Sequence, residues 1–164
     1  MIATVLGGIG PGNRKQGRRH MTEQARKVRE IMTTEVVTIG MDETLETARR
    51  IFNQRRFHHL IVVEGGKPVG VISDRDLLKN LSPFVGVRMS ERAQDIETLR
   101  RRIHQVMTRR LVSIEPDAPV AQAARAMMHH KVSCLPVIKN GSTLVGIITL
   151  RDLVRWVVID SIEK

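Results

Sequence analysis

The sequence is poor in cysteine, in aromatic residues and in long hydrophobic runs, and each shortage excludes a class of protein. Its single cysteine, Cys134, cannot form an intramolecular disulfide or a cysteine-based metal site, so we expect a reducing compartment, the cytoplasm. Aromatic residues make up 2% of the chain, which excludes an extensive base-stacking platform or an aromatic-lined pocket. No apolar stretch approaches the roughly 20 residues that a membrane-spanning helix needs, so we expect no membrane partner.

What the sequence does contain is enough apolar content for a folded core. Hydrophobic residues make up 41% and charged residues 27% of the 164 residues, which indicates a globular protein of one ordinary domain or two very small ones. The formal net charge of +10 favours phosphorylated or nucleic-acid partners. The basic residues are dispersed, however, with local groups such as Arg100–Arg102. This dispersal argues against nucleic acid as the main partner and leaves phosphate attraction open.

Residues 1–20 differ from the rest of the chain. They combine a Gly/Pro-rich apolar run with a basic end that contains no acidic residue, and they show no amphipathic period. The charges follow the apolar run, which is the reverse of a secretory signal. The segment Gly8–Asn13 lacks the third glycine of a dinucleotide-binding fingerprint. We therefore expect a flexible basic extension that contributes nothing to folding.

An internal repeat organises the remainder of the chain. Residues 32–66 align with residues 107–141 at an offset of 75, and residues 69–78 align with residues 145–154 at an offset of 76. Sixteen of these 45 pairs are identical. The sequence therefore contains two copies of one small unit.

Both copies predict the same order of elements. A short extended segment leads to an aspartate, Asp42 or Asp117, that is placed to cap a helix whose apolar residues recur at helical spacing. Two β-rich runs joined by a glycine-containing turn follow, as in a hairpin. A second helix opens at Ser73 in the first copy and at Thr149 in the second.

The predicted fold class is therefore α+β, with two β-α-β-β-α repeats. A unit of this size is too small to bury a robust core alone, so we expect the repeats to pack through their sheets with pseudo-two-fold symmetry. The expected organisation is an extension at 1–20, a first repeat at 21–82, a linker at 83–102 and a second repeat at 103–164.

The motifs of the two copies resemble a known family. The pieces "IMT", "HHLIVV" and "GVISDRDLL" return as "VMT", "SCLPVI" and "GIITLRDLV", and this order is similar to a tandem pair of cystathionine-β-synthase (CBS) domains, the Bateman module. The resemblance covers roughly 130 of the 164 residues. It implies a regulatory sensor of adenosyl nucleotides such as AMP, ADP or ATP, with no cofactor required, no catalytic activity and a regulated protein partner that the sequence does not identify.

Two segments, Gly70–Asp76 and Gly146–Asp152, match the ribose and phosphate motif of that family. Glycine permits close approach to the backbone, a helix start with a hydroxyl favours a phosphate, and a carboxylate can accept both ribose hydroxyls. A hydroxyl followed three residues later by an acid is also a capping box, which needs no ligand. Both roles can coexist in the candidate pairs Ser73 with Asp76 and Thr149 with Asp152.

The resemblance also implies that a basic pair before the second strand reaches the phosphates and that residues after "MT" frame the base. Only the first copy has such a pair, so if only one of the two clefts binds a ligand, we expect it to be the first. That cleft would contain His58, His59, Ser73 and Asp76, closed by Thr108, and the mirror cleft would contain Thr149 and Asp152, closed by Thr33 and Thr34. The alternative for the histidines is an exposed pair at a strand start. Adjacent residues on a strand point to opposite faces, so no metal site is expected.

Three functions remain open at this point: a ligand-sensing module, an interaction module whose clefts bind no ligand, and a nucleic-acid-binding protein, which we do not favour. Cys134 has no base partner close in sequence, so a catalytic thiol is not expected. Paired repeats leave apolar helix faces uncovered, and two-fold association is the commonest way to cover them. We therefore expect a homodimer, with Phe52, Met127, Met128 and Trp156 on its uncovered faces.

Overall fold

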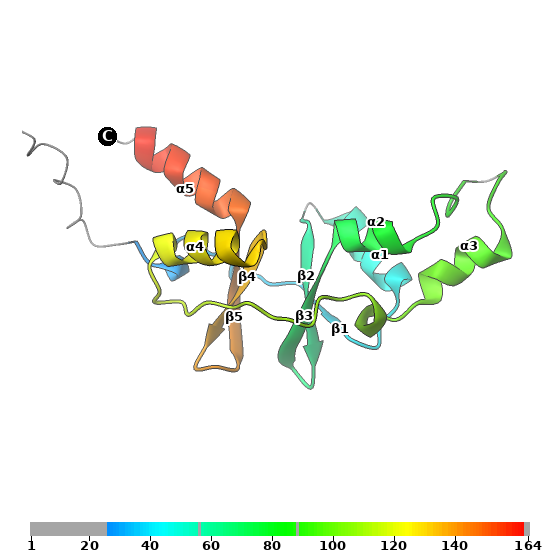
Figure 1. Ribbon diagram of the computed structural model, residues 1–164, viewed down its shortest axis with the longest axis horizontal. Coiled ribbons are helices and arrows are strands. Elements are labelled where there is room, and N and C mark those ends of the chain that lie inside the picture. Colours follow the sequence, from blue (N-terminus) through cyan, green and yellow to red (C-terminus); the bar gives the residue numbers. More distant parts are fainter. Residues whose placement is uncertain (1–25, 56, 88, 163–164) are drawn as a thin grey trace, which may run out of the picture.

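The computed structural model describes residues 26–55, 57–87 and 89–162, so the extension at 1–20 lies outside the described residues. Two repeats lie side by side along the long axis of the molecule (Figure 1). The first repeat contains β1 (Thr38–Gly40), α1 (Leu45–Gln54), β2 (His59–Glu64), β3 (Lys67–Ser73) and α2 (Asp74–Asn80). The second contains α4 (Val120–His130), β4 (Cys134–Lys139), β5 (Thr143–Thr149) and α5 (Leu150–Ile162). The short helix α3 (Ala93–Glu97) falls between the two repeats in the sequence. In space it lies beyond the outer end of the first repeat.

The predicted α+β fold is confirmed, and the strands pair as the repeat pattern requires. β1 runs parallel to β2, and β2 is antiparallel to β3. β4 and β5 form the matching hairpin, while the first strand of the second repeat is reduced to one bridge between Ile114 and Val137. Both hairpin turns use a left-handed backbone, with φ of +78° at Gly66 and +74° at Gly141. Within the described residues, no helix is both long and apolar enough for a membrane crossing.

The helix starts differ from the prediction. Asp42 and Asp117 are not the caps: α1 is capped by Thr44, and α4 follows Pro119. The segment that leads into the other repeat supplies an acceptor at the start of each helix. The carbonyl of Arg101 accepts from the first N–H of α1 at 2.9 Å. The carbonyl of Arg26 does the same for α4, also at 2.9 Å. Asp117 instead accepts from Lys27 at 2.9 Å, and this hydrogen bond lowers the pKa of the carboxyl group.

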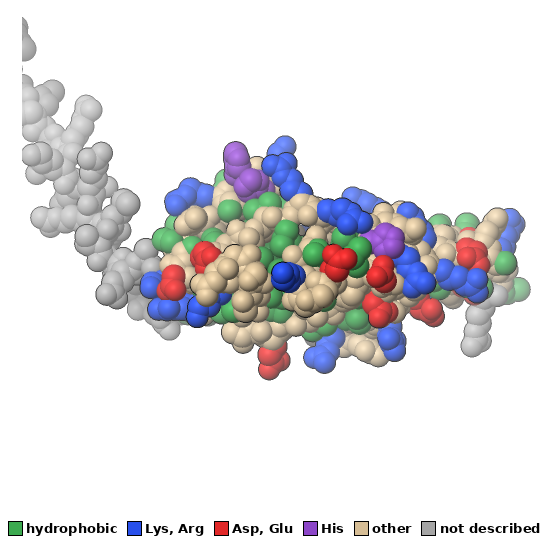
Figure 2. Space-filling model, turned by 90° about the horizontal axis from the view of Figure 1, so that it is seen from below, with side chains coloured by type: hydrophobic (Ala, Val, Ile, Leu, Met, Phe, Trp, Pro, Cys, Tyr) green, Lys and Arg blue, Asp and Glu red, His purple; other side chains and the backbone are tan. Residues whose placement is uncertain are grey.

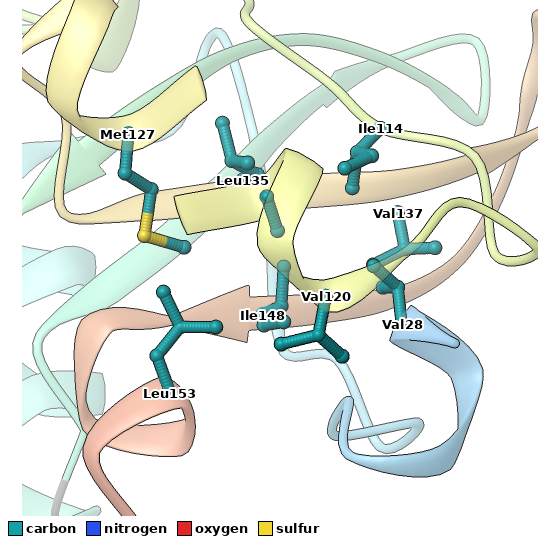
Figure 3. Packing of buried hydrophobic residues seen from close by; sticks show 9 residues of the cluster. Val28, Ile114, Val120, Met127, Leu135, Val137, Ile148 and Leu153 are labelled. Atoms are coloured by element: carbon teal, nitrogen blue, oxygen red, sulfur yellow. The ribbon is translucent and has the colours of Figure 1, made fainter. Parts of the chain in front are cut away.

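The segment that leads into each repeat completes the core of the other repeat. Val28 lies before β1 of the first repeat, yet it is fully buried among residues of the second, beside Val120 and Val137 (Figure 3). Ile103 lies at the start of the second repeat in the sequence and is fully buried in the core of the first.

Backbone hydrogen bonds hold these crossed segments in place. Thr33 and Ile147 exchange two bonds of 2.9 Å, and Thr108 and Val71 exchange bonds of 2.9 and 3.1 Å. Neither core is complete without the other repeat, so the two repeats form one structural unit.

The predicted exposed apolar set is mostly wrong. Met127 is buried, and Phe52 and Trp156 are half-buried against the cores, because α1, α4 and α5 use these residues for packing. Only Met128 is exposed, at 81%. The apolar side chains on the surface of the two second helices are instead Leu78 on α2 and Leu150, Val154, Val157, Val158 and Ile159 on α5.

The crossed segments generate the first prediction. A methyl group at Gly70 would lie 2.8 Å from the carbonyl oxygen of Thr108, a backbone atom of the crossed segment. Gly70→Ala should therefore lower the free energy of unfolding by about 1–3 kcal/mol, through overpacking. For a chain of this size that is roughly 2–12 °C in Tm, measured by thermal denaturation.

The matched control is Gly40→Ala in β1, where the nearest atom to an added methyl group is Glu43 Cγ at 3.5 Å, an ordinary contact. This variant should melt within about 2 °C of the wild type. Equal melting temperatures for the two variants would contradict the proposed tight crossing at Gly70.

Candidate functional site

A cavity of about 530 Å³ lies between the two repeats, within the size range of small-molecule sites. Its walls come from the segment after the first "MT", from the starts of β2 and α2, and from the end of β5 with the first turns of α5. The lining includes the apolar residues Val36, Val37 and Ile147. It also carries hydroxyl, carboxylate, imidazole and guanidinium groups, so the cavity is amphipathic.

The cavity gathers a different set of residues from the expected first cleft. Five of the nine candidates line it, namely Thr33, His58, His59, Thr149 and Asp152, whereas Thr34, Ser73, Asp76 and Thr108 do not. The two histidines therefore line the same cavity as Asp152, the candidate carboxylate of the second repeat. The cause is the direction of their side chains, since His59 contacts Ser133 and His58 contacts Arg151, both across the repeat boundary.

The carboxylate of Asp152 is held rigidly at the start of α5. Its Oδ2 accepts from the backbone N–H of Thr149 at 2.8 Å and from the Thr149 hydroxyl at 2.6 Å. The Ser73–Asp76 pair has the same geometry, with distances of 3.0 and 2.6 Å. The capping interpretation is therefore confirmed in both repeats. Only the Thr149–Asp152 pair also lines the cavity.

The two histidines have different environments. His58 Nδ1 lies 2.6 Å from Asp74 Oδ2, and His58 Nε2 lies 3.3 Å from Arg151 Nη2. A guanidinium group can only donate, so Nε2 accepts and the proton sits on Nδ1, toward the carboxylate. His59 Nε2 lies 3.0 Å from the Ser133 hydroxyl, and burial lowers the pKa of its imidazole.

Three arginines, Arg75, Arg151 and Arg155, also line the cavity and were not among the predicted site residues. In the described part of the chain none of them forms an ion pair with a carboxylate. Arg75 and Arg151 are an identical pair of the repeat, inside the same motif as the candidate carboxylates, and that identity could have revealed them. Arg155 has no such signal. These guanidinium groups, which have no carboxylate partner among the described residues, make the cavity suitable for an anion.

Cys134 does not contribute a reactive group. It is buried at the start of β4, and burial raises the pKa of its thiol to about 12, so the thiolate nucleophile is scarce at neutral pH. Across the residues that the structure describes, no three His, Cys, Asp or Glu side chains are grouped to hold a metal ion.

Basic and acidic side chains alternate over the surface seen in Figure 2 rather than forming one basic stripe. The dispersed charge of the sequence is thus also dispersed on this face of the molecule. A nucleic-acid duplex is recognised mainly through a continuous track of positive charge, which this face does not offer.

Comparison with known proteins gives one consistent family. The model of the CBS domain matches this chain twice, at residues 28–83 and 103–159. The chain is 35% identical over 128 residues to a CBS domain-containing protein of Dictyostelium discoideum, and the match covers 77% of this chain and 87% of that protein. It is 30% identical over 134 residues, or 80% of its length, to an uncharacterized protein of Methanocaldococcus jannaschii, but spans only 32% of that longer protein.

A solved structure shares both the fold and part of the sequence. It is the CBS domain pair of protein MJ0100 in complex with 5′-methylthioadenosine and S-adenosyl-L-methionine. The TM-score is 0.66 at 25% sequence identity, and the match covers 80% of this chain and 95% of that one.

The burial of His59 generates a prediction about pH. Its pKa is lowered in the folded protein, whereas in the unfolded chain it is about 6.5. As the pH falls below about 6.5 the unfolded chain takes up a proton that the folded chain resists, so stability falls until the folded pKa is reached. Tm should therefore drop more steeply between about pH 7 and pH 5 in the wild type than in His59→Gln, which can keep a hydrogen bond to Ser133. If Tm falls equally with pH in the wild type and in His59→Gln, burial of His59 is not the source of the pH dependence.

Proposed function

Because this chain belongs to the CBS domain family, we propose that it is a regulatory module that binds an adenosyl ligand in the cavity between its repeats and is not an enzyme. The observation that carries the proposal is the Asp152 carboxylate, which is fixed by Thr149 and borders an amphipathic cavity. We expect this chain in the cytoplasm, where ligand binding would act on a regulated protein partner.

The chemistry of the cavity suits the ribose and the adenine ring of an adenosyl ligand. Both hydrogen bonds from Thr149 end on Oδ2 of Asp152, so Oδ1 can accept from the ribose hydroxyls. The apolar residues Val36, Val37 and Ile147 of the lining offer a surface for the adenine ring. The adenosyl ligands of the similar MJ0100 domain pair support this class of ligand for the present chain.

The proposed site is the cleft of the second repeat rather than the first. Sequence reasoning favoured Asp76 because the two histidines precede the strand of the same repeat. The contacts of His58 and His59 with the second repeat favour Asp152 instead. An interaction module that binds no ligand is the alternative function.

This proposal predicts a difference between two equivalent carboxylates. Asp152→Asn should weaken binding of the best adenosyl ligand by at least about tenfold, because charge-assisted hydrogen bonds to the ribose are each worth about 1.5–3 kcal/mol. Asp76→Asn is the matched control, since it removes the same charge from the same capping geometry outside the cavity. Isothermal titration calorimetry with AMP, ADP, ATP and S-adenosylmethionine measures the effect.

One result would contradict the proposed function, and another would contradict the proposed site. If none of the four compounds binds the wild type below millimolar concentration, the module without a ligand becomes the better interpretation. If Asp76→Asn loses affinity while Asp152→Asn keeps it, the ligand occupies the first cleft.

We also propose that the chain associates as a homodimer through its second helices. Leu150, Val154 and Val158 recur at every fourth residue of α5 and are 50–56% exposed. Leu78, 72% exposed, is the equivalent of Val154 on α2. The pseudo-symmetric pair of helices thus presents apolar side chains that a second copy can cover in two-fold association.

Val154→Glu should convert the dimer into a monomer of 18.5 kDa in sedimentation velocity at micromolar concentration, because the new charge would be buried without a partner. Met128→Glu on α4 is the control, since this side chain is 81% exposed on a different helix, and it should stay dimeric. A monomeric wild type would refute the proposal.

A further inference from the structure

The pseudo-symmetry of the fold places two arginines in equivalent positions with different partners. Arg75 Nη2 reaches Ser133 Oγ of the second repeat at 3.4 Å, and Arg151 Nη2 reaches His58 Nε2 of the first repeat at 3.3 Å. Residues 58 and 133 are themselves equivalent in the repeat alignment. Each arginine therefore contacts the same position of the opposite repeat, but only Arg151 finds an imidazole there.

The contact between Arg151 and His58 crosses from the second repeat to the first along the wall of the cavity. Arg151 directly precedes Asp152 in the first turn of α5, and both residues line the cavity. On the other side, His58 is anchored by Asp74 in the first turn of α2, at 2.6 Å. The chain Asp74–His58–Arg151 thus links the first turns of α2 and α5 along the wall of the cavity.

The charges around Arg151 leave it available to an anion. Of the three carboxylates that line the cavity, Asp74 is engaged by His58 and Asp152 by Thr149, and Glu35 is exposed. Arg75 and Arg155 add positive charge to the lining of the same cavity. A neutral imidazole nitrogen offers a guanidinium group a single acceptor without opposite charge, whereas an anionic phosphate adds charge attraction and can accept two parallel hydrogen bonds.

We propose that Arg151 is the residue that selects a phosphorylated adenosine, by exchanging His58 Nε2 for an oxygen of the ligand's phosphate. This inference rests on the proposed function and narrows it, because the uncharged adenosine core or a sulfonium ligand offers no phosphate oxygen to Arg151. The exchange breaks the contact between α5 and His58. Ligand binding in the cavity thereby changes the contacts of the first repeat, through His58 and its hydrogen bond to Asp74.

Calorimetric titration of adenosine and of AMP into the wild type, Arg151→Gln and Arg75→Gln tests the selection. In Arg151→Gln, affinity for AMP should fall at least about tenfold, while affinity for adenosine changes less than about threefold. Arg75→Gln removes the same charge from the lining of the cavity but not the contact with His58, so its loss of affinity for AMP should be at least about threefold smaller than that of Arg151→Gln. Equal losses in the two variants would overturn the proposal, since the overall positive charge of the cavity, and not Arg151, would then select the ligand.

The imidazole of His58 provides a second measurement. Its NMR ring signals should shift on addition of AMP but not of adenosine, and the AMP-induced shift should disappear in Arg151→Gln. If both compounds bind but His58 responds to both or to neither, the exchange is refuted while the proposed function stands. If neither compound binds the wild type, the proposed exchange fails, and the proposed function fails with it only if ADP, ATP and S-adenosylmethionine do not bind either.

Discussion

The crossing of the leading segments is the constraint on which the rest of the structure depends. Val28 fills the second core and Ile103 fills the first, and the crossed backbones pair at Thr33 with Ile147 and at Thr108 with Val71. This pairing sets the distance between the repeats, because Gly70 admits the Thr108 carbonyl where any side chain would collide with it. It also carries Thr33 to the edge of the cavity, so the position of the candidate site follows from the same crossing.

Much of the fold was predictable because it is encoded locally and twice. The spacing of apolar residues, the turns at Gly66 and Gly141 and the two capping boxes need only neighbouring residues, and all appear in the structure. The caps at Asp42 and Asp117 were not predictable in this way. The cap of α1 is the nearby Thr44, and the first N–H of both α1 and α4 donates to a carbonyl more than 50 residues away in the sequence. Local patterns contain no information about such a distant partner.

The candidate site shows the same division. A repeat alignment identifies equivalent positions, so it supplied Asp76 and Asp152 together, but it does not say which side chains of one repeat face the other. His58 belongs to the first repeat by sequence and to the wall beside Asp152 by contact. The difference between His58 and Ser133 at one position turns a symmetric scaffold into an asymmetric cavity.

The crossed segments also have a consequence for how the chain folds. Val28 packs against residues 114–153, so the second core closes only after most of the chain has been brought together. Contacts of such long sequence separation slow folding, because loop-closure entropy is lost before the contacts form. Neither repeat can complete its core before the other repeat is in place. We therefore expect a single slow folding phase in which both repeats acquire their native packing together.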